Sequence, residues 1–189
     1  MANSILIFST ILLFLNLVTA QNYSFSRTLS PEELGIKPTK LTHLHFYFHD
    51  ITEGPNSTVV TVAGAPEETR NTATFFGNVV VMDDPLTVGP ELSSKLVGRA
   101  QGIYTYASQS DIGLLLVLNF IFMEGKYNGS TLSILGRNAI LSKVREMPIV
   151  AGTGIFRFAR GYVEARTYEF EPQISLNAIV EYNAYVYHY

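Results

Sequence analysis

The chain has 189 residues and a formal net charge of -3, and it contains no cysteine and no tryptophan. This length suits one domain of ordinary size, and the small acidic charge provides no basic field for nucleic acid or an anionic membrane. Without cysteine, the chain has no disulfide scaffold, no thiolate-ligated zinc, no iron–sulfur cluster and no thiol nucleophile.

The first segment, residues 1–20, is predicted to be a signal peptide that is removed. It contains an uncharged, mostly apolar run from Ile5 to Val18, which is shorter than the roughly 20 residues that usually span a bilayer. A membrane anchor is the alternative, and the short run disfavours it. Val18-Thr19-Ala20 offers the small residues of a signal-peptidase site, so we expect cleavage before Gln21 and a secreted protein.

Three Asn-x-Ser/Thr sequons support secretion, and the predicted glycosylation sites are Asn22, Asn56 and Asn128. Each should lie on an exposed loop. The segment 21–40 shows no periodicity and is predicted to be a poorly ordered N-terminal arm. We expect the remainder, 41–189, to form one domain.

After the arm, short runs of β-branched and aromatic residues recur between clusters of turn residues. The predicted strands are Leu41 to Ile51, Val59 to Ala63, Phe75 to Met82, Leu96 to Tyr106, Gly113 to Met123, Ser130 to Leu135, Met147 to Val150, Ile155 to Thr167 and Ala178 to Tyr187. Asp83-Asp84-Pro85 and Gly152-Thr153-Gly154 are interpreted as turns. The apolar run 111–122 is compatible with a buried helix, but its β-branched content favours a strand. Eight or nine strands with short connectors indicate an antiparallel barrel or sandwich.

The first predicted strand carries the most informative pattern, because its residues alternate between two faces. Phe48 and Asp50 share the apolar, inward face with two further hydrophobic residues. This places a carboxylate at the end of an otherwise hydrophobic interior row, where burial would make it a candidate general acid or base. The alternative is that Asp50 caps a turn at the end of the strand.

The opposite face of this strand carries His43, His45 and His49, which raises the possibility of a metal site. Side chains two apart on one strand rarely close a tetrahedron without a second strand. A solvated or partner-facing surface is therefore the preferred interpretation, and we predict no metal and no cofactor. The motifs HExxH, G-x-S-x-G, P-loop and G-x-G-x-x-G are also absent from the sequence, which disfavours common hydrolases and nucleotide enzymes.

Further along the chain, Tyr104 and Tyr106 share one face of their predicted strand. Tyrosines in a cavity stack on aromatic ligands and hydrogen-bond to their phenols. Arg145, with Asn138 seven residues before it, supplies a permanent positive charge that would hold an aspartate ionised or bind a phenolate. The alternative for Arg145 is a surface ion pair with Glu146.

Several blocks of the sequence together resemble plant dirigent proteins, in the order found in that family. They are HFYFHDI at 45–51, DDPLT at 83–87, KLVGRAQG at 95–102, YNGSTL at 127–132, RE at 145–146, GTG at 152–154 and FRFARGY at 156–162. The resemblance implies an all-β fold, an eight-stranded antiparallel barrel of the allene-oxide-cyclase-like kind. It also implies a homotrimer, secretion to the apoplast and a role in phenylpropanoid chemistry. The best-known members direct the coupling of two coniferyl alcohol radicals, made by a separate oxidase, to one lignan enantiomer.

The resemblance places catalytic roles on Asp50, Tyr104, Tyr106 and Arg145, with Asn138 and Phe48 as substrate-binding residues. Lignan-forming members carry a second aspartate on a loop seven residues before the arginine, where this chain has Asn138. An amide supplies neither a proton nor a negative charge to a quinone methide. The Gly-Arg-Asn version is found in a branch that includes pterocarpan synthase-like members, which dehydrate an isoflavanol and close its ring through a quinone methide.

Three functional hypotheses follow from these observations. The first is stereocontrol of phenoxy-radical coupling, or of a related quinone methide cyclisation, by a protein without its own redox centre. The second is a lyase, an isoflavanol dehydratase with Asp50 as its one acid–base carboxylate. The third is a non-catalytic secreted binding barrel, which the absence of tryptophan for sugar stacking disfavours.

Overall fold

The computed structural model describes residues 26–35, 37 and 39–189. The predicted signal peptide and the sequon at Asn22 lie outside the described residues. Within the predicted arm, a turn covers residues 31–35, and Ser30 and Glu33 cap it by exchanging side-chain-to-backbone hydrogen bonds.

The part of the chain that the structure describes contains nine strands and three single-turn 3₁₀ helices. The strands are β1 (Lys40–Asp50), β2 (Val59–Ala63), β3 (Val79–Thr87), β4 (Leu96–Tyr106), β5 (Gly113–Phe122), β6 (Thr131–Ala139), β7 (Arg145–Thr153), β8 (Arg160–Phe170) and β9 (Ala178–His188). The helices are η1 (Glu67–Thr69), η2 (Gly125–Tyr127) and η3 (Gly154–Phe156). The described residues include no helix long and apolar enough to cross a membrane.

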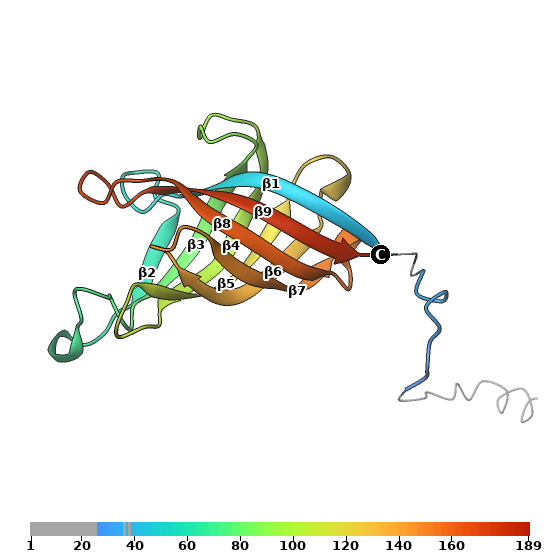
Figure 1. The fold of residues 1–189 in the computed structure, drawn as a ribbon, viewed down its shortest axis with the longest axis horizontal. Helices are drawn as coiled ribbons and strands as arrows, with labels where there is room; N and C mark the ends of the chain where they lie inside the picture. Colours follow the sequence, from blue (N-terminus) through green and yellow to red (C-terminus); the bar gives the residue numbers. More distant parts are fainter. Residues whose placement is uncertain (1–25, 36, 38) are drawn as a thin grey trace, which may run out of the picture. The chain divides into compact units, whose positions relative to one another are not determined.

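The strands form one antiparallel sheet that closes on itself (Figure 1). The order is β1-β9-β8-β7-β6-β5-β4-β3, and a short pairing of β1 with β3 joins the two ends. In that pairing Tyr47 lies opposite Thr87 and Phe48 lies opposite Leu86. The remaining strand, β2, is not part of this closed ring and pairs only with the first half of β3. The expected eight-stranded antiparallel barrel is therefore confirmed, and closure leaves its strands without a long free edge.

Strand β3 continues through Asp83-Asp84-Pro85, so the turn predicted there is wrong. The two aspartates are separated by the alternation of the strand: Asp83 faces outward and pairs with Arg99, whereas Asp84 faces inward and is fully buried. The backbone N–H of Asp83 donates to Thr58, so the nitrogen of Pro85, two residues on, points to the same side of β3. On that side β3 changes partner from β2 to β1, and a proline, which lacks an N–H, fits there.

Three other predictions about local structure need correction. Asn138 lies inside β6 and not on a loop, because β6 runs on to Ala139. Gly152 and Thr153 end β7, and the turn follows as η3. Phe75 precedes β3 and has a left-handed backbone, with φ at 56°.

One end of the barrel interior is filled by aromatic rings. Phe46 stacks on Tyr182 and meets Phe120 edge-to-face, and Phe156 contacts both Phe122 and Tyr127. Beside them β4 presents small residues inward: a Cβ on Gly102 would lie 2.2 Å from the carbonyl oxygen of Val117 on β5. The rings close this end, and the interior beyond Phe48 and Tyr182 is left for a cavity.

The outer face of the sheet carries a row of exposed apolar side chains from β2 to β6. Cross-strand pairing aligns Val60, Val81, Ile103, Val117 and Leu135, one from each strand. Each is between 38% and 63% exposed. A continuous apolar row on five neighbouring strands is unusual for a surface that faces only water.

Candidate active site

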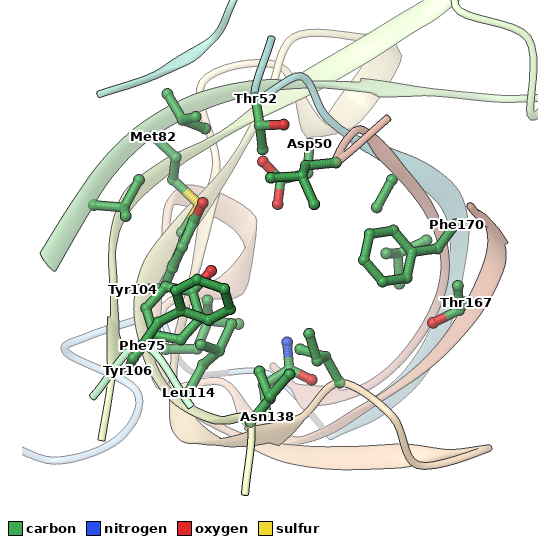
Figure 2. Close-up of a pocket in the computed structure, with 18 of the residues that line it drawn as sticks. Asp50, Thr52, Phe75, Met82, Tyr104, Tyr106, Leu114, Asn138, Thr167 and Phe170 are labelled. Atoms are coloured by element: carbon green, nitrogen blue, oxygen red, sulfur yellow. The ribbon is translucent and has the colours of Figure 1, made fainter. Parts of the chain in front are cut away.

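The open end of the barrel contains a cavity of about 610 Å³, which is within the usual range for small-molecule sites. Most of its lining is apolar or aromatic. Its other polar lining residues are Asp50, Thr52, Glu53, Thr61, Asn78, Asn138, Arg145 and Thr167. Figure 2 shows Asp50 and Thr52 on one side of the cavity and Asn138 on the opposite side. Tyr104 and Tyr106 lie on the wall between them.

Asp50 is the last residue of β1, and it lines this cavity as the alternation of the strand predicts. Its Oδ1 atom is buried and has no hydrogen-bond partner. Because burial disfavours the charged form, the pKa of Asp50 is raised to about 7. A carboxyl group that is protonated below neutral pH and faces an apolar cavity is suited to donate a proton. The turn-capping alternative loses support, since a capping carboxylate accepts backbone N–H bonds.

Tyr104 and Tyr106 form the wall of the cavity on β4, with ring centroids 6.1 Å apart. Burial raises the pKa of both phenols, and the neighbouring Asp50 raises them further. Both side chains therefore remain hydroxyl groups that donate hydrogen bonds at physiological pH. Phe48 lies beside Tyr182, and both line the cavity near the end that the aromatic rings fill.

Arg145 begins β7 and is only 4% exposed, so it is not the surface residue that an ion pair with Glu146 would require. Its Nε donates to Oδ1 of Asn138 at 3.1 Å, and its Nη1 donates to Oγ1 of Thr167 at 2.7 Å. Both partners are neutral. Burial lowers the pKa of Arg145, but an arginine remains charged in proteins. A buried cation held by neutral groups at the wall of a cavity is prepared to bind an anionic or electron-rich oxygen.

The structure thus brings the six residues predicted from the sequence, Asp50, Tyr104, Tyr106, Arg145, Asn138 and Phe48, to one cavity. Their roles in binding and catalysis remain predictions. The sequence did not identify Thr167, whose hydroxyl group holds Arg145, or Phe75, whose ring lies against Tyr106 with centroids 5.4 Å apart. No motif marks a single threonine on β8. The left-handed backbone of Phe75 has no local signal either, because glycine is the residue expected there.

Phe75 provides a test of the cavity wall, because Phe158 has a similar left-handed backbone, with φ at 62°, but does not line the cavity. Changing either residue to glycine relieves roughly 1–2 kcal/mol of backbone strain, partly offset by the flexibility of glycine. We expect both variants to melt within a few degrees of the unmodified protein. Only Phe75→Gly should weaken binding of an aromatic probe in the cavity, by about 10-fold, in a fluorescence titration. Equal affinities in the two variants would show that the Phe75 ring is not part of the site.

The three histidines of β1 are held by three different partners. His43 bonds to Asn183, His45 to Glu181 and His49 to Oγ1 of Thr87. His49 is buried, which corrects the expected solvated surface at that position. Within the described residues, no group of three or more potential metal-ligating side chains is present. The other two predicted glycosylation sites, Asn56 and Asn128, are both exposed.

Comparison with known proteins agrees with this geometry. The family model described as Dirigent-like protein matches residues 41–187. Dirigent protein 21 of Arabidopsis thaliana is 53% identical over 93% of this chain and 94% of its own length. Pterocarpan synthase 1 of Glycyrrhiza echinata is 54% identical over 94% of this chain and 92% of its own length. The solved structure of the pterocarpan synthase dirigent protein GePTS1, 54% identical, superimposes with a TM-score of 0.78 over 87% of this chain and 99% of that one.

Proposed function

Because the chain belongs to the dirigent family, which acts on phenolic substrates, we propose that it directs a phenolic quinone methide to one stereochemical outcome inside its cavity. The observation that carries this proposal is the position of Asp50, a carboxyl group with a raised pKa that faces an aromatic cavity across from Asn138, to which Arg145 is hydrogen-bonded. In the first form of the reaction, the quinone methide arises when two monolignol radicals, made by a separate oxidase, couple in the cavity.

The acid in this mechanism is Asp50. Its pKa is about 7, so the carboxyl holds its proton below that pH and donates it to an oxygen of the bound substrate. The resulting carboxylate then accepts a proton from the hydroxyl group that closes the ring, which restores the acid. Since the protonated form is required, the rate should fall as the pH rises through about 7.

Arg145 stabilises phenolate character as it develops on the substrate. Asn138 and Thr167 hold the guanidinium in place without neutralising it, because neither carries a charge. The hydroxyl groups of Tyr104 and Tyr106 donate hydrogen bonds along the wall and fix the orientation of the rings. A fixed orientation is what selects one face of the quinone methide for attack.

The second form of the reaction is the dehydration of an isoflavanol and the closure of its ring, as in a pterocarpan synthase. Asn138 favours this form, because its amide oxygen is already engaged with Arg145 and the site has no ionisable group at that position. Proton donation to a leaving hydroxyl group needs a single acid. Sequence identity does not choose between the two forms, because Dirigent protein 21 and pterocarpan synthase 1 of Glycyrrhiza echinata are 53% and 54% identical to this chain.

A product assay separates the two forms. Coniferyl alcohol is oxidised by a laccase with and without the protein, and the enantiomers of the lignan products are resolved by chiral chromatography. Enantiomeric enrichment supports the first form. A racemic product, together with conversion of an isoflavanol by the protein alone, supports the second. If neither reaction responds while phenols still bind, the protein is a binding barrel and the proposed function is wrong.

Dirigent proteins are generally secreted, and we infer that this chain is secreted to the apoplast as a homotrimer. The apolar row formed by Val60, Val81, Ile103, Val117 and Leu135 supports the trimer, because a continuous exposed apolar face is typical of an interface between copies of one chain. The row lies on the outside of the barrel, so assembly would leave the cavity end accessible.

Ile103 is at the centre of this row, and we expect Ile103→Glu to dissociate the trimer. Burying an uncompensated carboxylate in three equivalent contacts costs several kcal/mol in total. Size-exclusion chromatography with light scattering should show the mass of one chain in place of three. Leu41→Glu is the control, since Leu41 is 72% exposed at the start of β1 and lies outside the row. A trimer that survives Ile103→Glu would exclude this face as the interface.

A further inference from the structure

A second buried carboxyl group, that of Asp84, lies beside the site and has no role in the mechanism above. Asp84 is on β3, is fully buried, and does not line the cavity. Its Oδ1 accepts a hydrogen bond from the hydroxyl group of Thr58, and its Oδ2 is buried without a partner. An unpartnered buried oxygen is costly, so its surroundings need an explanation.

The register of the barrel closure places this group next to Asp50. The pairing of β1 with β3 ends with Phe48 opposite Leu86, and the same antiparallel register continued by two residues would set Asp50 opposite Asp84. The charge of Asp50 acts on Asp84, which agrees with this placement. Facing residues of antiparallel strands have Cβ atoms about 4.5–5.5 Å apart. Thr58 lies at the same point, because its side-chain oxygen accepts from the backbone N–H of Ile51, the residue after Asp50, and donates to Asp84.

Two carboxyl groups at this spacing, each with one unpartnered buried oxygen, cannot both be ionised at low cost. One proton placed between Oδ1 of Asp50 and Oδ2 of Asp84 would satisfy both oxygens. Arg99, a cation whose charge acts on Asp84, is already paired with Asp83 on the outer face. The titratable or charged groups around the two carboxyls are Tyr104, Tyr106, Tyr182, Arg99, Asp83 and, on the far wall, Arg145.

We propose that Asp84 is a positioning residue that shares a proton with Asp50, so that the two carboxyls act as one acid. The role of this pair in turnover rests on the proposed function, although the pairing itself does not. When Asp50 gives its proton to the substrate, the pair passes from two protons to one. The remaining proton, on Asp84, then forms a hydrogen bond to the new carboxylate and stabilises it.

The pKa values agree with this assignment. Burial and, after it, the charge of the neighbouring Asp50 together raise the pKa of Asp84 to about 8, while the Thr58 hydroxyl opposes the rise. We assign the proton that leaves first to Asp50, because Asp50 lines the cavity and Asp84 does not. Asp50 exchanges protons with the cavity, and Asp84 holds the second proton.

Carbon-13 NMR of the aspartate carboxyl carbons tests the pairing without any substrate. In the unmodified protein, we expect the carbons of Asp50 and Asp84 each to report both titration steps, as strongly coupled groups do. In Asp50→Asn, the midpoint of Asp84 should fall by at least about one pH unit, because the neighbouring charge is gone. Asp83→Asn is the matched control, since Asp83 is adjacent in sequence but faces outward, and it should leave both steps in place.

The variant Asp84→Asn tests whether the pairing of the two carboxyl groups affects turnover. The amide still donates a hydrogen bond to Asp50 but holds no exchangeable acid proton, so Asp50 should titrate in a single step, and the midpoint of the fall in kcat/KM with pH should move to the midpoint of that step. Independent, single-step titrations in the unmodified protein, or a charged Asp84 at pH 6, would overturn the pairing. If no phenolic substrate is turned over but the coupled titration is found, the pairing stands and the proposed function fails. Should Asp84→Asn not fold, the Asp50→Asn titration alone decides.

Discussion

Asp50→Asn is expected to lower turnover by roughly 10²- to 10⁴-fold while the protein remains folded, because the proton-donating group is lost and its shape is kept. The assay is the formation of enantiomerically enriched lignan or of pterocarpan, whichever the product test identifies. Binding of the phenolic substrate should change much less, since the aromatic wall and Arg145 are untouched. Asp83→Asn is the control for a general effect of removing one carboxylate.

The difference in free energy of unfolding between Asp50→Asn and the unmodified protein should grow as the pH rises. The folded protein holds the Asp50 proton up to about pH 7, whereas the unfolded chain releases it near its ordinary value of 3.8. The free energy of unfolding of the unmodified protein therefore falls as the pH rises between these values. The variant has no carboxyl group to ionise at this position, so its free energy of unfolding does not fall in this way. Relative to the unmodified protein, it should gain stability from nothing near pH 4 to about 4 kcal/mol above pH 7. A marked fall in Tm with normal turnover would contradict both parts of the prediction.

The second large effect is expected for Arg145→Met, which should lower turnover by roughly 10²- to 10³-fold. The charge that stabilises phenolate character is removed, while the volume of the side chain is largely kept. The free energy of unfolding should change little, because loss of the bonds to Asn138 and Thr167 is offset by the removal of a buried cation without an acidic partner. Thermal unfolding and steady-state kinetics on the same preparation separate the two quantities.

Two further variants make the Arg145 result interpretable. Arg145→Lys keeps the charge but cannot donate to Asn138 and Thr167 from a planar fork, so an intermediate loss of about 10-fold is expected. Arg166→Met removes an arginine from β8 whose side chain is 43% exposed and pairs with Glu164, and it should leave turnover unchanged. Equal losses for Arg145→Met and Arg166→Met would show that net charge matters and the cavity does not.

The alternation of residues along the strands made much of the fold and the site predictable. Asp50 at the end of a hydrophobic row and Tyr104 with Tyr106 on one face are consequences of a two-residue period, and that period holds wherever one face of a strand is buried. The closed barrel, in contrast, came from the resemblance between whole blocks of sequence. Periodicity alone left a barrel and a sandwich equally possible.

What sequence reasoning missed depends on contacts between distant strands. Aspartate and proline are rare in strands, so their pattern at 83–85 predicts a turn. Arg99, Thr58 and the change of partner strand make the extended conformation acceptable. A residue of a predicted turn is expected at the surface, so the sequence did not identify Asp84 as a buried carboxyl group. His49 is buried because Thr87 accepts its hydrogen bond across the closure, and nothing within β1 indicates that.

The hydroxyl group of Thr58 belongs to two features of this protein, a sequon and a buried hydrogen bond. It completes the sequon of Asn56, a predicted glycosylation site, and it donates a hydrogen bond to Asp84. Thr58→Ala would therefore remove the sequon and the hydrogen bond to Asp84 in one step. Asn56→Gln removes the predicted glycosylation site alone, and Thr58→Ser keeps both the sequon and a hydroxyl group that can donate to Asp84. A substitution meant to test glycosylation at this loop therefore has to change Asn56 and leave Thr58 in place, so that the hydrogen bond to Asp84 is kept.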